Sequence, residues 1–209
     1  MVEESSHKRM ARILGEYLPV SRGAVRMAMQ KKREARLKGK PVKSIGEILI
    51  ETGAITREDL DIAVKKQRAD RLGQCPVFAS LSSTELIALG SNFKEISLPA
   101  DRQFIMQGEN DATLYVLVAG RVEVFRMDDD GTRIHIAYVS PVEPIGEMGY
   151  FQHGERVASV RTVDPVELLS APYSSLTHYF ENVPRVALAF LDVVKRRQEE
   201  TERRMKENK

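Results

Sequence analysis

Residues 94–170 alternate apolar and polar side chains over short segments that turn residues separate. Gly120 follows the apolar run 114–118, and a second alternating segment begins at Val122. The Asp-Gly pair at 130–131 is a strong signal for a tight hairpin turn. Because a period of two places apolar side chains on one face of a strand, this stretch predicts an antiparallel meander. With helical patterns on both sides of it, the chain is expected to have an α+β fold.

Residues 184–207 have the periodicity of one helix. Pro184 stands at its start, where a missing N–H costs nothing. Apolar residues at helical spacing form a stripe along the first half, namely Val183, Ala187, Phe190, Leu191 and Val194. Acid-before-base pairs four residues apart follow in the second half, a favourable order in a helix. We interpret the segment as a lid or dimerisation helix, since packing as a lid and a homodimer explain the stripe equally well.

The front of the chain, which has a helical pattern over residues 8–70, contains an internal repeat. Leu-Gly-Glu-Tyr-Leu at 14–18 matches Ile-Gly-Glu-Ile-Leu at 45–49. In each copy a capping residue, Ser21 or Thr56, then precedes a longer amphipathic segment. Each copy therefore predicts a short helix, a turn and a longer helix. Two such units can bury their apolar faces on each other, which neither can do alone.

The net charge of +2 hides opposed blocks: +6 over residues 1–70, −6 over 71–180 and +2 over 181–209. This split predicts separate modules. We place them at 1–70, a helical tandem-repeat docking module; 71–183, a β-roll with a leading helix; and 184–209, the C-terminal helix. The run 30–40 has six basic residues in eleven. We interpret this run as a solvated helix end and linker; an anionic partner such as nucleic acid is the alternative, although no aromatic residue is present for base stacking.

Several classes of chemistry are not expected. The four histidines have no metal-ligand spacing among themselves or with Cys75, so we predict no metal site. The triphosphate-binding loop and the hydrolase serine elbow are both missing. We interpret Cys75, the single cysteine, as a small buried apolar residue. A binding protein is therefore favoured over an enzyme. The chain has no apolar run that spans a bilayer and no signal-peptide core, so a cytoplasmic location is expected.

The segment 145–160 combines groups that suit a sugar phosphate. Gly146 allows close backbone approach, and residues 147–151 have room for one helical turn, whose free N–H groups favour an anion. Arg156 supplies a planar cation that suits a phosphate. Glu147 supplies a carboxylate that accepts hydrogen bonds from two hydroxyls, as a ribose offers.

This ordered set resembles the phosphate-binding cassette of the cyclic nucleotide-binding domain family, the β-roll (jelly-roll) of cyclic AMP receptor proteins and protein kinase A regulatory subunits. The similarity covers roughly residues 76–197. It implies that Glu147 binds the ribose 2′-hydroxyl and that Arg156 pairs with the cyclic phosphate. It also implies backbone contacts from Gly146, Met148, Val157 and Ala158. Ser159 would lie near the base. Val124 and Ile136 would line the apolar side of the purine site. The competing interpretation is a degenerate roll in which Arg156 and Glu147 form a mutual salt bridge.

The second copy of the front repeat, residues 45–67, resembles one arm of the N-terminal domain of type II secretion and type IV pilus assembly ATPases. Some of those domains bind cyclic di-GMP, but both copies here lack the usual arginine before Leu-Gly or Ile-Gly, at Ile13 and Ser44. We therefore expect this module to dock a protein partner.

Together these patterns predict a bacterial, non-catalytic regulatory protein that functions in signal transduction. It binds cyclic AMP, or alternatively cyclic GMP, with no other cofactor. Two alternatives are a nucleotide-independent scaffold and a cyclic di-GMP responsive adaptor of a pilus or secretion machine. Nucleic acid is not an expected partner, because no helix-turn-helix motif follows the last helix.

Overall fold

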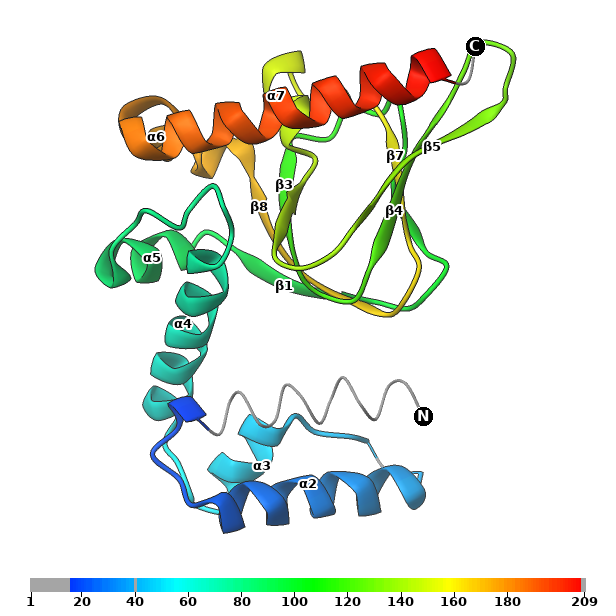
Figure 1. Cartoon of the computed structure of the whole chain (residues 1–209). Helices are drawn as coiled ribbons and strands as arrows, with labels where there is room; N and C mark the ends of the chain where they lie inside the picture. Colours follow the sequence, from blue (N-terminus) through cyan, green and yellow to red (C-terminus); the bar gives the residue numbers. More distant parts are fainter. Residues whose placement is uncertain (1–15, 40, 208–209) are drawn as a thin grey trace. The chain divides into compact units, whose positions relative to one another are not determined.

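A computed structural model of the chain describes residues 16–39 and 41–207. The chain divides into two compact units, residues 1–68 and 69–209, which are described separately (Figure 1). Residues 184–209, predicted as a separate segment, lie within the second unit. Leu14 and Gly15, which open the first copy of the repeat, lie outside the described residues. No helix of the described chain has the length and apolar character that a membrane crossing requires.

The first unit contains three of the four helices that the repeat predicts, and the short helix of the first copy, at 14–18, lies partly outside the described residues. The three are α2 (Arg22–Leu37), α3 (Ile45–Glu51) and α4 (Arg57–Gly73), whose last residues continue into the second unit. Both predicted N-caps are confirmed. The Ser21 hydroxyl accepts a hydrogen bond from the Ala24 N–H at 3.2 Å, and the Thr56 hydroxyl accepts one from the Asp59 N–H at 3.1 Å. Each cap satisfies a donor that a helix start otherwise leaves unpaired.

Apolar residues of both copies share one core in this unit. Leu18 and Ala28 from the first copy pack with Ile48, Leu49 and Ala63 from the second. The predicted mutual burial of the two copies is therefore confirmed for the described residues. This packing supplies most of the stability of such short helices, because isolated helices of this length are marginal in water.

The second unit is an antiparallel β-roll with flanking helices, so the predicted fold class is confirmed. Its elements in chain order are α5 (Ser83–Gly90), β1 (Lys94–Leu98), β2 (Gln103–Ile105), β3 (Thr113–Ala119), β4 (Val122–Met127), β5 (Arg133–Val139), β6 (Glu143–Ile145), η1 (Glu147–Gln152), β7 (Ser159–Thr162), β8 (Val166–Pro172), η2 (Tyr173–Ser175), α6 (Thr177–Asn182) and α7 (Pro184–Glu207).

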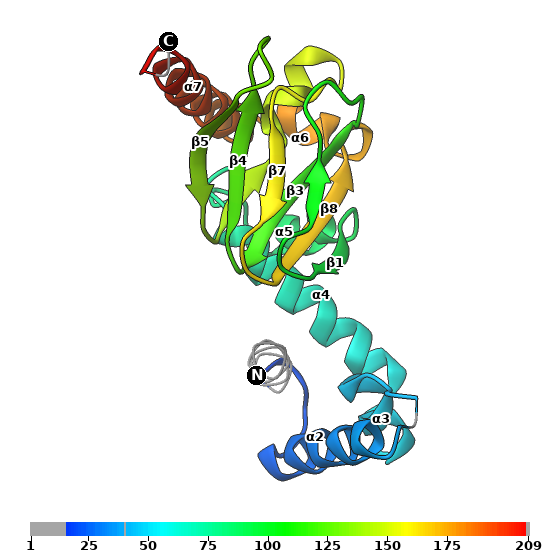
Figure 2. The same cartoon turned by 90° about the vertical axis from the view of Figure 1, so that its right-hand side faces the viewer.

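The strands form two four-stranded sheets, ordered β1-β8-β3-β6 and β2-β7-β4-β5. All of the pairings are antiparallel. Figure 2 shows β4 between β5 and β7 in the second sheet. The predicted hairpin between β4 and β5 is confirmed. There the Gly131 N–H donates to the Asp128 carbonyl at 3.0 Å, and Gly131 has a φ of 79°.

The last helix, α7, begins at Pro184 and ends at Glu207, as the sequence predicted. It packs along β5 and η1 (Figure 1). Val186, Phe190 and Val193 are its buried residues, and they belong to a core that the roll shares with α5 and α6. This arrangement brings the second half of α7 to the mouth of the roll.

Candidate functional site: a pocket between the roll and the last helix

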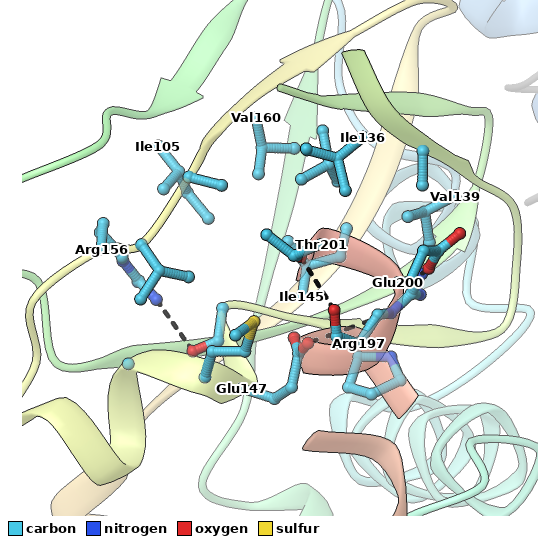
Figure 3. Close-up of a pocket in the computed structure, with 18 residues that line it drawn as sticks. Ile105, Ile136, Val139, Ile145, Glu147, Arg156, Val160, Arg197, Glu200 and Thr201 are labelled. Atoms are coloured by element: carbon cyan, nitrogen blue, oxygen red, sulfur yellow. Dashed lines mark hydrogen bonds and ion pairs between the residues drawn. The ribbon is translucent and has the colours of Figure 1, made fainter. Parts of the chain in front are cut away.

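A cavity of about 60 Å³ lies between the second sheet, the segment 144–158 and α7. Figure 3 shows aliphatic side chains above it, Arg156 at one end and residues of α7 at the other. The residues that line it are Ile105, Val124, Ile136, Ala137, Val139, Pro144, Ile145, Gly146, Glu147, Met148, Gly149, Arg156, Val157, Ala158, Val160, Arg197, Glu200 and Thr201. Its walls are therefore mostly apolar, with a few charged groups that converge on it.

Gly146 immediately precedes the helical turn η1. The presence of η1 confirms the turn predicted at 147–151. The φ of Gly146, 84°, lies in the left-handed region, where a side chain is strained. A Cβ atom on Gly146 would also collide with the guanidinium of Arg156. Glycine is therefore required here for two separate reasons, backbone conformation and space for the arginine.

Arg156 is buried, with 2% of its surface exposed. Its Nη1 donates to the Gly146 carbonyl and the Tyr173 hydroxyl, both at 3.1 Å. Its Nη2 donates to the Asp111 carboxylate at 2.6 Å and the Thr113 carbonyl at 2.7 Å. The fifth donor, Nε–H, is buried and has no partner among the described residues. An unpaired buried donor on a cation is costly unless an acceptor comes to it.

Asp111 neutralises the guanidinium of Arg156 in this state. Burial alone would raise the pKa of the Asp111 carboxyl, but the hydrogen bonds that it receives from Arg156 and Thr113 lower it below its ordinary value. The Tyr173 hydroxyl stays protonated, since burial raises its pKa to about 12. Tyr173 therefore donates to the Gly146 carbonyl, which ties η1 to the arginine.

Glu147 is buried at the other side of the pocket, with 5% exposure. Burial raises the pKa of its carboxyl, and the positive charge of Arg197 opposes that rise. The Arg197 Nε lies 4.0 Å from the Glu147 Oε1. The salt bridge between Arg156 and Glu147 in the competing interpretation is wrong, because each residue has another ionic partner.

Residues of α7 close the pocket. Arg197 has a side chain 16% exposed, and it lies 3.6 Å from Glu143 and 3.4 Å from Glu200. Arg196, beside it in sequence, is 56% exposed, and its one ionic partner among the described residues is Glu143, at 3.0 Å. Arg197 thus connects α7 to Glu147 and to Glu143 of strand β6.

The structure brings eight of the predicted site residues together around the cavity: Gly146, Glu147, Met148, Arg156, Val157, Ala158, Val124 and Ile136. Ser159 is the exception. It does not line the cavity, and its hydroxyl accepts a hydrogen bond from the Gln107 N–H at 3.0 Å. Its predicted place near a base stays a prediction, because the hydroxyl keeps its own O–H as a donor.

The sequence analysis missed the contributions of Asp111 and Tyr173 and of three residues on α7. Glu200 and Thr201 follow Arg197 by three and four residues, so both lie on the same face of the helix as Arg197. That spacing was a usable signal, whereas nothing in the sequence linked Asp111 to Arg156. The interpretation of Cys75 as a buried residue is confirmed, and burial raises the pKa of its thiol to about 12.

Comparisons with known proteins show what this unit is similar to. The family model described as "Cyclic nucleotide-binding domain" matches residues 95–182. Residues 95–182 are therefore similar to a cyclic nucleotide-binding domain, and relatives of the chain include CRP-like regulators.

Two of these bacterial relatives show the extent of the similarity. One is the CRP-like cAMP-activated global transcriptional regulator of Mycobacterium tuberculosis, 24% identical over 60% of this chain and 56% of the relative. The other is the cyclic AMP receptor protein of Thermus thermophilus, 29% identical over 61% of this chain and 59% of the relative. The crystal structure of Thermus thermophilus catabolite activator protein superposes with a TM-score of 0.56 and 28% identity, over 63% of this chain and 62% of that one. This chain spans a little over half the length of the curated relatives.

These comparisons lend no support to the predicted resemblance of the front module to secretion ATPases, and the family match does not extend to that module. The expectation that nucleic acid is not a partner also lacks support, because the relatives are named transcriptional regulators.

Proposed function

We propose that the second unit is a non-catalytic sensor that binds a cyclic mononucleotide in the cavity between the roll and α7. The observation that carries this proposal is the buried guanidinium of Arg156, whose Nε–H has no acceptor among the described residues. An anionic phosphodiester supplies that acceptor and adds a charge-assisted hydrogen bond, which is about twice as strong as a neutral one.

The other lining residues are given roles that follow from their chemistry. Glu147 accepts hydrogen bonds from the ribose hydroxyl. The backbone of Gly146, Met148, Val157 and Ala158 surrounds the phosphate end. Val124 and Ile136 form part of the apolar wall for the purine. We choose cyclic AMP over cyclic GMP because the relatives are named for cyclic AMP.

The small volume of the cavity implies that α7 moves when a nucleotide binds. Ligand pockets commonly enclose about 300–1,000 Å³, whereas this one holds about 60 Å³. A cyclic nucleotide therefore requires Arg197, Glu200 and Thr201 to move away from the mouth of the roll. Binding then shifts α7 by differential affinity for the open state. We further propose that the front module passes this change to a protein partner.

Calorimetric titration of the full chain with cyclic AMP, cyclic GMP and cyclic di-GMP tests the proposal. We expect cyclic AMP to bind with a micromolar or lower dissociation constant. Arg156→Gln is expected to abolish this binding, and Glu147→Gln is expected to weaken it by about tenfold, for about 1.4 kcal/mol of lost hydrogen bonding.

Arg196→Gln is the matched control, because this exposed arginine does not line the cavity. It is expected to bind like the natural chain. The absence of heat with every nucleotide, from a chain whose circular dichroism shows it folded, would favour the nucleotide-independent scaffold instead. Binding of cyclic di-GMP alone would favour the adaptor of a secretion or pilus machine.

A further inference from the structure

Arg126, on β4, is a partly buried cation to which the proposed nucleotide site gives no role. Its Nε–H is buried and has no hydrogen-bond partner among the described residues. Its guanidinium also makes no ion pair in that part of the chain. A buried donor on a cation is costly unless an acceptor reaches it. The guanidinium of Arg126 is therefore available to an acceptor on a bound molecule.

The side chain of Arg126 lies on the inner face of the second sheet. Side chains two positions apart on a strand share a face, and Val124, two residues before Arg126, lines the cavity. The bulge in the pairing of β4 with β5 leaves its extra residue, Ile136, on β5, so the alternation along β4 is uninterrupted.

The pairing of the two strands places Arg126 in the same way. Arg126 is directly opposite Ile134 of β5, and opposite residues of an antiparallel pair lie on one face. Ile134 packs with Val124 and Ile136, which both line the cavity. Arg126 therefore continues the apolar wall of the cavity, about 7 Å along the strand from Val124.

Arg126 belongs to the end of the cavity that lies away from the phosphate site. Figure 3 shows Arg156 and Glu200 at opposite ends of the cavity. One helical turn beyond Thr201, which lines the cavity, Met205 packs against Ile134, the residue paired with Arg126. When Arg156 holds the phosphate of a nucleotide, the outer edge of its purine therefore extends toward Arg126.

The guanidinium of Arg126 distinguishes between the two purines. Arginine has only donors. Guanine has two acceptors on one edge, O6 and N7, which match the donor fork of arginine in a bidentate pair. Adenine has N7 but carries an amino group at position 6, which is a donor and does not accept from arginine. Glu200, the acid at this end, does not discriminate in this way, because both purines carry an amino group.

From these observations we infer that Arg126 is a specificity-determining residue that donates to O6 and N7 of a 6-oxopurine, so that the site accepts cyclic GMP as well as cyclic AMP. This inference rests on the proposed function, because it assigns the base end of the same site. Contacts to the phosphate, the ribose and the apolar wall serve both nucleotides, and only guanine completes the pair with Arg126. The movement of α7 that binding requires takes Met205 away from Ile134 and opens the space beside Arg126.

Calorimetric titration of the full chain with cyclic AMP, cyclic GMP and cyclic IMP tests this inference. Cyclic IMP has the O6 and N7 of guanine but lacks the amino group, so it separates Arg126 from contacts to that group. We expect Arg126→Met to weaken binding of cyclic GMP and cyclic IMP by roughly tenfold each, and that of cyclic AMP by less than about threefold. Arg126→Lys, which has a point charge in place of the donor fork, is expected to restore part of the loss.

Arg121→Met is the control, because it removes the same charge beside β4 from a side chain that is 49% exposed. It is expected to leave all three affinities unchanged. Circular dichroism verifies that each variant is folded.

Two results would overturn the inference and leave the proposed function standing. The first is that Arg126→Met loses affinity for all three nucleotides equally, or for none of them, which would make Arg126 a structural residue. The second is that the natural chain binds cyclic AMP but neither cyclic GMP nor cyclic IMP, a result that depends on no variant. A natural chain that binds none of the three would overturn the proposed function, and this inference with it.

Discussion

At the scale of single residues, Gly146 shows how backbone conformation and the candidate phosphate site depend on each other. It adopts a φ of 84°, and its missing side chain leaves room for the Arg156 guanidinium. The same guanidinium donates to the carbonyl of Gly146. Any side chain at position 146 must therefore displace the arginine, even where the backbone tolerates the strain.

Gly146→Ala is expected to destabilise the second unit by about 1–3 kcal/mol and to abolish cyclic AMP binding, because both strain and displacement of Arg156 act. Gly131→Ala is the matched control. Gly131 has a similar φ of 79°, but nothing lies within 4 Å of an added Cβ. The Gly131→Ala variant should lose stability through backbone strain alone and keep its affinity for cyclic AMP. Urea unfolding and calorimetry measure the two effects, and equal losses of affinity in both variants would contradict this account.

At the scale of elements, periodicity predicted α7 well, and the same holds for the hairpin and the repeat of short and long helices. These features depend on local spacing and turn chemistry, which a sequence displays directly. The partners of Arg156 were not predictable in this way. Asp111 lies 45 positions before Arg156 and Tyr173 lies 17 after it, and only strand pairing brings them together. The hydrogen bond from the Gln107 N–H to Ser159 was not predictable for the same reason, because the two residues are 52 positions apart.

The closure of α7 over the pocket depends on Arg197 more than on Arg196. Arg197 is mostly buried and contacts Glu147, Glu143 and Glu200, whereas an exposed ion pair such as that of Arg196 contributes little. Arg197→Gln is expected to destabilise closure by about 1 kcal/mol, so amide exchange in residues 198–207 becomes roughly fivefold faster. Arg196→Gln is expected to leave that exchange unchanged. Hydrogen exchange with mass spectrometry measures both; similar rates in the two variants would show that Arg197 does not hold the helix.

At the scale of the whole chain, separate hydrophobic cores account for the two units. The core of the first unit runs from Leu18 to Ala63, and the main core of the second begins at Ala69. Within the described ranges, these two cores share no buried residue. Separate cores predict separate stability, because each unit satisfies its own apolar faces. The opposed charges of the two sequence blocks already suggested this division, although charge alone did not locate its boundary within α4.

A chain that begins at residue 69 therefore tests whether the second unit suffices for nucleotide binding. It keeps every residue that lines the cavity, the partners of Arg156 and the whole of α7. We expect it to fold cooperatively and to bind cyclic AMP with a dissociation constant within about threefold of the full chain, a difference under about 0.7 kcal/mol. A cooperative fold with affinity weakened by more than about tenfold would instead show that the first unit stabilises the nucleotide-bound state, and the proposed relay would then operate at the level of ligand affinity.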